Sequence, residues 1–317
     1  MTHSTSQKRK NLSLFIFISI NLVGALILLS ACSQTATPEA SLHGHLLVEG
    51  STALQPLTTI AASLFEKRYS QVQIEVRGGG SLVGLDTVTK QQADIGNSDI
   101  YADPALYPDP NLTDHIVCII PFTMISNLDI TLPTLKQEEI IDIFVTGKLY
   151  NWSQLGGPNL PIVPVIRADT SGTRASFLKY VLDGKSEKNG LQKTNSSQEM
   201  LNFVARTPGA IGYMGLPSLN AAKVHVHTLA INGVASTPAA IASGKYAFWG
   251  YEHMYTMSNN LNSVLTPFLQ FMLTPTVQEQ AQHMGYIPLD QVHFSTPTPQ
   301  AQGSNSSTVN LTGRDAD

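Results

Sequence analysis

One pattern of residues, repeated three times, constrains the fold of this 317-residue chain more than any other feature. A short apolar run is followed by a turn of glycine and hydroxyl residues, and then by apolar residues at helical spacing. The three segments are HLLVEGSTALQPLTTIAASLFEKRY (45–69), VQIEVRGGGSLVGLDTVTKQQ (72–92) and IVPVIRADTSGTRASFLKYVL (162–182). Strands that alternate with helices favour an α/β fold with a largely parallel sheet. Ligands of such sheets bind beyond the carboxyl ends of the strands, so the turns are candidate ligand sites.

Each turn is expected to place unpaired backbone N–H groups at the start of a helix, where the helix dipole favours negative charge. Glycine lets a ligand approach the backbone closely, and Ser and Thr add hydroxyl donors. One such turn alone is more simply explained by ordinary N-capping. Three turns of this kind, one of which carries Arg167, instead indicate an anion-binding site at the helix N-termini.

Arg167 and Asp99 give this site its charged groups. The guanidinium of Arg167 offers a planar fork of donors that suits an oxyanion. Asp99 follows a strand-like run and could either cap the next turn or face the ligand. An ionised aspartate is only an acceptor, so beside an anion it favours one that carries a proton and disfavours sulfate. Asp169 could hold Arg167 in place or cap the following helix.

Four motifs of the chain resemble those of a known family. They are GSTALQPL (50–57), GGGSLVGL (78–85), IGNSDI (95–100) and RADTSGT (167–173), of which the last is the most specific. In order and rough spacing they resemble the phosphate-binding proteins of bacterial high-affinity phosphate ABC transporters. The resemblance covers most of residues 45–294. It implies an α/β, two-lobed periplasmic-binding-protein-like fold of type II, with the ligand in the interlobe cleft.

The resemblance also implies which residues hold phosphate. Thr52 would contribute its hydroxyl, Ala53 its backbone N–H, and Asp99 would accept the proton of the anion. The other implied contacts come from the second and third turns: Ser81, Arg167, Ser171, Gly172 and Thr173. Ala53 departs from some members of the family, which matters little if only its N–H is used. Ser51 and Gly80 are further neighbours of the site.

In this family the chain leaves the first lobe, builds the second lobe and then returns. The first lobe is expected to comprise residues 45–121 and 250–294, and the second lobe residues 122–249. This division puts the first two turns and Asp99 on one lobe and the RADTSGT turn on the other. A ligand that bridges both would stabilise the closed form, because it gains contacts there that the open form lacks.

The N-terminus has the anatomy of an export signal. A basic triplet (8–10) precedes an apolar stretch that ends in LSAC (29–32). This ending resembles a bacterial lipobox, which implies a lipoprotein signal peptide over 1–31 and lipidation of Cys32. The alternative is a plain transmembrane anchor. Either interpretation places the rest of the chain outside the cytoplasm.

Two polar segments flank the expected folded part. Residues 32–44 are expected to form a lipid-anchored tether, and residues 295–317 a disordered tail. The formal net charge of −4 becomes −7 once the three basic residues are removed with the signal. A nucleic-acid binder usually carries a basic stripe, and the sequence has none beyond its first residues, so we expect no nucleic-acid partner.

The sequence lacks the motifs of several other function classes. It has no G-x-S-x-G nucleophile elbow, and its glycine-rich turn lacks the lysine of a nucleotide-binding loop, so we expect no enzyme. His225 and His227 have strand spacing but no third ligand nearby, so we expect no metal and no cofactor. Cys118 lies in an apolar run and is expected to be buried.

These observations together predict a monomeric, extracytoplasmic, lipid-anchored solute-binding protein. It would capture inorganic phosphate and deliver it to the membrane permease subunits of an ABC importer. One alternative is a binding protein for another oxyanion, such as sulfate or molybdate. A second is a surface phosphate sensor or adhesion protein on the same fold. Whether Asp99 faces the ligand distinguishes the first alternative, and phosphate uptake after deletion distinguishes the second.

Overall fold

The computed structural model describes residues 42–294; the expected signal peptide, Cys32 and the C-terminal tail lie outside this range. Strands and helices alternate along the described part, as the sequence pattern predicts. In chain order they are β1 (His43–Gly50), α2 (Gln55–Arg68), β2 (Gln71–Gly78), α3 (Ser81–Thr89), β3 (Ile95–Ser98), β4 (Leu112–Ser126), β5 (Thr134–Leu135), α4 (Gln137–Ile141), the π-helical η1 (Asp142–Thr146), the 3-10 helical η2 (Trp152–Leu155), β6 (Val163–Arg167), α5 (Gly172–Tyr180), β7 (Gln192–Thr194), α6 (Ser197–Arg206), β8 (Ala210–Gly215), α7 (Leu216–Asn220), β9 (His227–Ile231), α8 (Pro238–Ala242), β10 (Trp249–Met257), α9 (Leu265–Met272), α10 (Pro275–Met284) and the 3-10 helical η3 (Leu289–Gln291).

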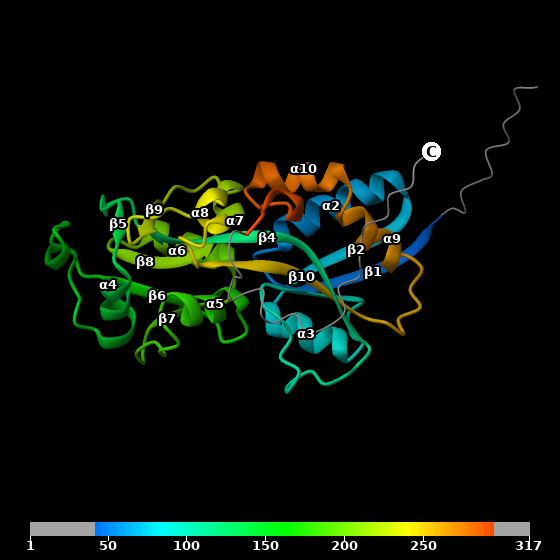
Figure 1. Cartoon of the computed structure of the whole chain (residues 1–317), viewed down its shortest axis with the longest axis horizontal. Helices are drawn as coiled ribbons and strands as arrows, with labels where there is room; N and C mark the ends of the chain where they lie inside the picture. Colours follow the sequence, from blue (N-terminus) through cyan, green and yellow to red (C-terminus); the bar gives the residue numbers. More distant parts are fainter. Residues whose placement is uncertain (1–41, 295–317) are drawn as a thin grey trace, which may run out of the picture. The chain divides into compact units, whose positions relative to one another are not determined.

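Strands β1, β2 and β3 form a parallel group whose carboxyl ends are aligned. β1 pairs with β2 along its whole length and with β3 over its last residues, so that Gly50 lies between Gly78 and Asn97. Helices α2, α9 and α10 lie on one side of these strands and α3 on the other (Figure 1). The residues that follow the three strands therefore meet at one edge of the sheet.

The strand order of the sheet is β2-β1-β3-β10-β4-β8-β6-β7. β10 is antiparallel to both of its neighbours, β3 and β4. Beyond β4, strands β8, β6 and β7 form a second group in which β6 is parallel to β8 and to β7. Helices α5 and α6 both contact β6 and β8. In this second group the ring of Phe177 on α5 stacks on Tyr213 of β8, with 4.0 Å between centroids.

The long strand β4 connects the two groups. It pairs with β10 as far as Pro121 and with β8 from Phe122 to Ser126. The chain comes back into the first group through Trp249, the first residue of β10. The architecture is thus a two-lobed α/β fold. The exact lobe boundaries, at 121/122 and 249/250, remain predictions.

The helices that follow the three glycine–hydroxyl turns begin where the sequence pattern predicts. α2 carries Pro56 in its first turn, where proline costs no hydrogen bond. Gly80 is the N-cap of α3 and has a φ of 96°, a conformation that other residues avoid. Ser171 is the N-cap of α5, and its side chain accepts a hydrogen bond from Arg174 N.

Cys118 is buried, as its apolar run predicts, and other apolar side chains are buried as well. Cys118 and Met254 are fully buried, each with an exposed fraction of 0%. Trp152 is equally buried, and its indole Nε1 donates to Gly209 O at 2.9 Å, which fits a packing role rather than ligand stacking.

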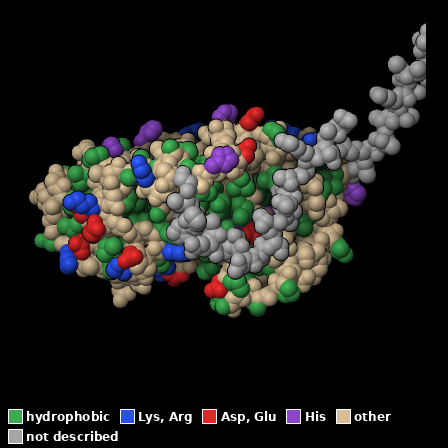
Figure 2. Space-filling model, viewed as in Figure 1, with side chains coloured by type: hydrophobic (Ala, Val, Ile, Leu, Met, Phe, Trp, Pro, Cys, Tyr) green, Lys and Arg blue, Asp and Glu red, His purple; other side chains and the backbone are tan. Residues whose placement is uncertain are grey.

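On the face of the molecule drawn in Figure 2, basic and acidic side chains are interspersed and form no continuous basic patch. Within residues 42–294, none of the helices has the length and apolar character needed to cross a membrane.

Candidate functional site: an anion cradle

The first two turns are held together by backbone hydrogen bonds at the carboxyl ends of β1, β2 and β3. Gly80 N donates to Gly50 O, and Ser51 N donates to Asn97 O, both at 2.9 Å. Gly50 has a φ of 136°, and a Cβ there would lie 2.2 Å from Asn97 O. Only glycine allows the end of β1 to approach β3 and α3 so closely, so Gly50 helps to bring the starts of α2 and α3 together.

The third turn comes from the second strand group and meets the first two. Leu82 N donates to Thr170 O at 3.1 Å, and the Thr170 hydroxyl donates to Gly79 O at 2.8 Å. Gly172 lies against Ser81 so closely that a Cβ on Gly172 would be 2.3 Å from Ser81 Oγ. The N-termini of α2, α3 and α5 thus converge between the two lobes.

Arg167, at the end of β6, is a buried cation, with 1% of its surface exposed. Its guanidinium donates to Thr52 Oγ1 at 3.0 Å and, more weakly, to Ser197 Oγ at 3.4 Å. Its Nε has no hydrogen-bond partner, and within residues 42–294 no carboxylate oxygen lies within ion-pair distance of it. Burial lowers the pKa of Arg167 from its usual value, and the nearby charge of Asp99 partly opposes this effect.

Asp99 follows β3 and is also buried. Its two carboxylate oxygens accept hydrogen bonds from the hydroxyls of Ser51 and of Thr173, the latter at 2.7 Å. Its backbone N–H donates to Ser81 Oγ at 2.9 Å. Since Thr173 belongs to the third turn, Asp99 joins the two lobes through its side chain.

The structure brings every residue of the expected phosphate site to this one location. Thr52, Ser81, Asp99, Arg167 and Thr173 are linked by the contacts described above, and Gly172 packs against Ser81. Two of the expected donors have local partners as well. Ala53 N donates to Ser51 Oγ at 3.0 Å, and Ser171 Oγ accepts from the helix backbone.

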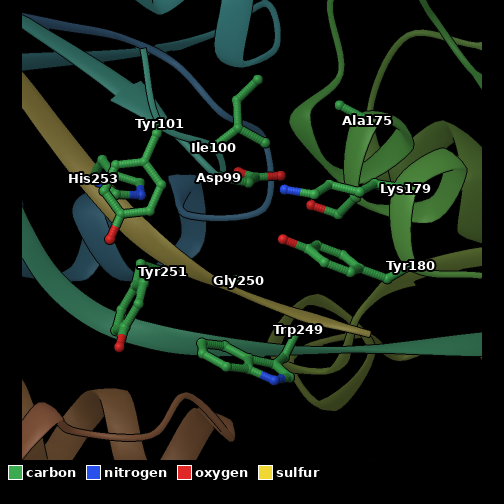
Figure 3. Close-up of a pocket in the computed structure, with 11 residues that line it drawn as sticks. Asp99, Ile100, Tyr101, Ala175, Lys179, Tyr180, Trp249, Gly250, Tyr251 and His253 are labelled. Atoms are coloured by element: carbon green, nitrogen blue, oxygen red, sulfur yellow. The ribbon is translucent and has the colours of Figure 1, made fainter. Parts of the chain in front are cut away.

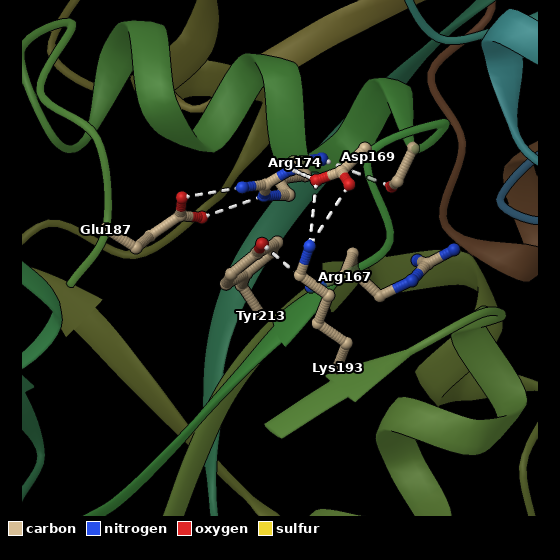
Figure 4. A network of polar contacts seen from close by, with 7 residues as sticks. Arg167, Asp169, Arg174, Glu187, Lys193 and Tyr213 are labelled. Carbon is tan, nitrogen blue, oxygen red and sulfur yellow. Dashed lines mark hydrogen bonds and ion pairs between the residues drawn. The ribbon is translucent and has the colours of Figure 1, made fainter. Parts of the chain in front are cut away.

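Asp169 does neither of the things proposed for it from the sequence. It does not hold Arg167, and the N-cap of α5 is Ser171. Its carboxylate instead pairs with Arg174 and with Lys193 Nζ, the latter at 3.1 Å, while its own side chain is 72% exposed. Figure 4 shows this network, with the Arg167 guanidinium directed away from it. Arg174 also forms a two-pronged contact with Glu187, at 2.9 and 3.0 Å.

Ser197, the first residue of α6, is a member of the site that the sequence analysis missed. Its side chain is buried and lies 3.2 Å from Thr52 Oγ1, and its backbone N–H donates to the same oxygen at 3.2 Å. The adjacent Ser196 is the N-cap of α6. A capping serine next to a buried one looks like an ordinary helix start, so the sequence carried no separate signal for Ser197.

A cavity of about 240 Å³ borders the cradle at Asp99. Aromatic rings from the loop after β3 and from β10 line it, among them Tyr101, Trp249 and Tyr251. The side chain of Lys179, on α5, points into it (Figure 3). The cavity therefore lies between elements of both lobes, next to the carboxylate that joins them.

A family model described as a PBP superfamily domain matches residues 35–276 of this chain. The chain belongs to the PBP superfamily. Among curated relatives of this superfamily member, the phosphate-binding protein PstS of Bacillus subtilis is 36% identical over 276 residues, which are 86% of this chain and 89% of the relative. The phosphate-binding protein PstS of Borreliella burgdorferi is 22% identical over 251 residues, 76% of this chain and 88% of that protein.

Solved structures of two other proteins support the fold. A Clostridium perfringens protein, assigned as a phosphate ABC transporter substrate-binding protein and solved with bound phosphate, has a TM-score of 0.72 at 24% identity, covering 78% of this chain and 100% of its own. An ABC-type phosphate transport receptor of Vibrio cholerae has a TM-score of 0.61 at 22% identity, covering 76% of this chain and 99% of its own. These structural similarities support the two-lobed α/β architecture.

Proposed function

We propose that this protein captures inorganic phosphate between its two lobes and delivers it to the permease of an ABC importer, without chemical change of the ligand. The observation that carries the proposal is the buried guanidinium of Arg167, whose only protein partners in the described chain are the neutral hydroxyls of Thr52 and Ser197. A buried cation is costly unless a counter-charge compensates it. An anion bound among the three helix N-termini provides that charge.

Asp99 supports phosphate over sulfate as the ligand. Its carboxylate accepts a hydrogen bond from Thr173 and acts electrostatically on Arg167, so an anion that bridges the lobes would touch it. Hydrogen phosphate and dihydrogen phosphate can donate a hydrogen bond to this carboxylate, whereas fully ionised sulfate cannot. The relatives named phosphate-binding protein PstS support the same ligand.

Titration calorimetry tests the ligand. The full-length protein, purified in detergent and freed of bound anion, is titrated with phosphate, sulfate and molybdate. Binding of phosphate with little binding of the other two is the expected result. Preference for sulfate or molybdate would support the anion-binding site but reject phosphate as its ligand. Binding of none of them would reject the anion site and leave the adhesion alternative. An uptake assay with labelled phosphate in a deletion strain separates a component of an importer from a surface phosphate sensor.

The proposal also includes a location and an assembly state. We infer a monomer held outside the cytoplasm by a lipid on Cys32, on the basis of the LSAC sequence. In cells fed a labelled fatty acid, the wild-type protein should take up label and Cys32→Ala should not. Label on the variant would reject this anchor. A mass measured by light scattering that exceeds one chain would reject the monomer.

A further inference from the structure

A fully buried acid, Glu252, lies in the middle of β10. Its exposed fraction is 0%, and neither of its carboxyl oxygens has a hydrogen-bond partner among the described residues. An ionised carboxylate in such a place would lose its hydration without compensation. The neutral, protonated form of Glu252 is therefore favoured, and its O–H needs an acceptor.

The register of the sheet relates Glu252 to Asp99. β10 pairs antiparallel with β3, and His253 lies opposite Ser98 at the end of the ladder. The same register, continued one step beyond the paired residues, would bring Glu252 opposite Asp99. Residues directly opposite each other in an antiparallel pair place their side chains on the same face, with Cβ atoms about 5 Å apart.

The pKa of Glu252 reflects the same surroundings. Burial raises it well above its usual value, and the Asp99 carboxylate raises it further, as a nearby charge and as an acceptor. The two carboxyls therefore act on each other, although neither carboxyl oxygen of Glu252 has a formed hydrogen bond among the described residues. The other titratable groups acting on this part of the core are Cys118 and Tyr286, whose pKa values are also raised, first by burial and then by Glu252 among other charges. Both are neutral in their usual forms.

Asp99 has the opposite environment. The hydroxyls of Ser51 and Thr173 donate to its two oxygens, and the guanidinium of Arg167 attracts its negative charge. Donors and a cation stabilise the ionised form of a carboxyl, whereas Glu252 has neither. When two coupled carboxyls share one proton, the proton resides on the one with the poorer support for charge.

We propose that Glu252 is a positioning residue for anion selectivity, which holds the one proton of the buried pair and donates it in a hydrogen bond to Asp99. Asp99 then stays a carboxylate and accepts a hydrogen bond only from an anion that carries a proton. This inference rests on the proposed function, because it concerns the selectivity of the same site.

Two substitutions separate the proton of Glu252 from its volume. Glu252→Gln keeps the shape and an N–H donor toward Asp99, and it cannot ionise. Glu252→Leu fills the space and removes the donor. Glu279→Gln, an exposed residue of α10, is the matched control for the same chemical change. Each full-length variant is titrated with phosphate and with sulfate at about pH 5.5 and about pH 7.5, on either side of neutral.

The ratio of phosphate affinity to sulfate affinity is the informative quantity. We expect Glu252→Gln and the control to keep the wild-type ratio at both pH values. In Glu252→Leu the donor toward Asp99 is lost, so the carboxylate is no longer held to accept from a protonated anion, and the ratio should fall by about tenfold at both pH values. An unchanged ratio in a folded Glu252→Leu protein, or an equal loss in Glu252→Gln, would overturn the inference.

An infrared measurement tests the proton directly and does not depend on the leucine variant. The wild type should show the carbonyl stretch of a protonated carboxylic acid, and Glu252→Gln should lack this band. Absence of the band from the wild type would overturn the inference while leaving phosphate binding intact. If the wild type bound no phosphate, the proposed function would fail, and the selectivity role would fail with it.

Discussion

Arg167 and Thr52, which are 115 positions apart in the sequence, are joined by a hydrogen bond of 3.0 Å from the guanidinium Nη2 to the threonine Oγ1. Thr52 follows β1 and Arg167 is the last residue of β6, and these strands belong to different lobes, so this contact spans the boundary between the lobes. It is a contact between a buried cation and a neutral acceptor. A ligand that offers an anionic oxygen at the same place would gain a stronger, charge-assisted bond from Arg167 and would hold both lobes together.

Replacing Arg167 with alanine should weaken phosphate binding. The lost charge-assisted bond is worth about 1.5–3 kcal/mol, which corresponds to about a 10- to 150-fold rise in Kd. Calorimetric titration measures the change. Arg206→Ala, which removes an exposed arginine from the end of α6, is the control and should bind like the wild type. Near-normal affinity of Arg167→Ala would remove this residue from the ligand site.

Asp99→Asn should weaken the discrimination against sulfate. The amide offers a donor where the carboxylate offers only acceptors, so sulfate is no longer repelled. Competition of sulfate with labelled phosphate measures the effect. The exposed Asp103→Asn variant, which can keep its turn contact with Ala105 N, should leave the competition unchanged. If Asp99→Asn discriminated against sulfate as strongly as Asp103→Asn does, the role of Asp99 as proton acceptor would be contradicted.

The two serines at the start of α6 should respond differently to replacement by alanine. Ser197→Ala removes a hydroxyl beside Thr52 and Arg167 and should cost about 0.5–1.5 kcal/mol of phosphate binding. Ser196→Ala removes the N-cap and should cost about 1 kcal/mol of stability, with little change in affinity. Calorimetry and thermal unfolding separate the two effects. A loss of affinity only in Ser196→Ala would reverse the assignment.

Gly172→Ala should hinder closure of the lobes more than folding. The added Cβ would lie 2.3 Å from Ser81 Oγ and 3.0 Å from Asp99 Cβ, both on the opposite lobe. Alanine is compatible with the first turn of a helix, so the ligand-free protein should keep nearly its normal Tm. The rise in Tm on addition of phosphate should be much smaller than in the wild type, because the ligand stabilises only the closed form. A rise in Tm equal to that of the wild type would show that closure of the lobes tolerates the methyl group.

Glu252→Gln should change how stability depends on pH. The folded-state pKa of Glu252 is raised above the usual value of 4.5. Below pH 4.5 the residue is protonated in both the folded and the unfolded chain, so it does not change the free energy of unfolding there. As the pH rises above 4.5, the unfolded chain releases this proton while the folded chain keeps it. The wild type should therefore lose about 1.4 kcal/mol per pH unit relative to Glu252→Gln, until the folded-state pKa is reached. Urea unfolding of the ligand-free proteins measures this difference, and parallel curves would argue against the buried proton.

The features of the site that could be predicted from the sequence are local ones. The glycine–hydroxyl turns, the helices that follow them and Arg167 at a strand end all come from short contiguous patterns. Asp169 was misassigned because its partner Lys193 lies on β7, and only the parallel pairing of β6 with β7 brings the two together. Chain spacing alone made Arg167 look like the nearer partner.

Glu252 was missed for a related reason. It is the single acid of a largely aromatic and apolar strand, and it forms no motif with the residues next to it in the sequence. Its relation to Asp99 depends on β10 lying beside β3, although the two strands are about 150 positions apart in the chain. Unlike the turns, pairings between strands that are distant in the chain cannot be recognised from a short stretch of sequence.

The place of β10 in the strand order has a consequence for how the protein is made. β3 and β4 are neighbours in the sequence, yet β10 lies between them and is formed from residues 249–257. Until that segment has been synthesised, β3 and β4 each present an unpaired edge toward the missing strand. The sheet of the first lobe therefore cannot be completed before residues 249–257 are available, although synthesis of this lobe starts first. A chain interrupted before Trp249 would leave these edges free to join the edges of other chains, so complete synthesis and prompt closure of the sheet protect the protein from aggregation.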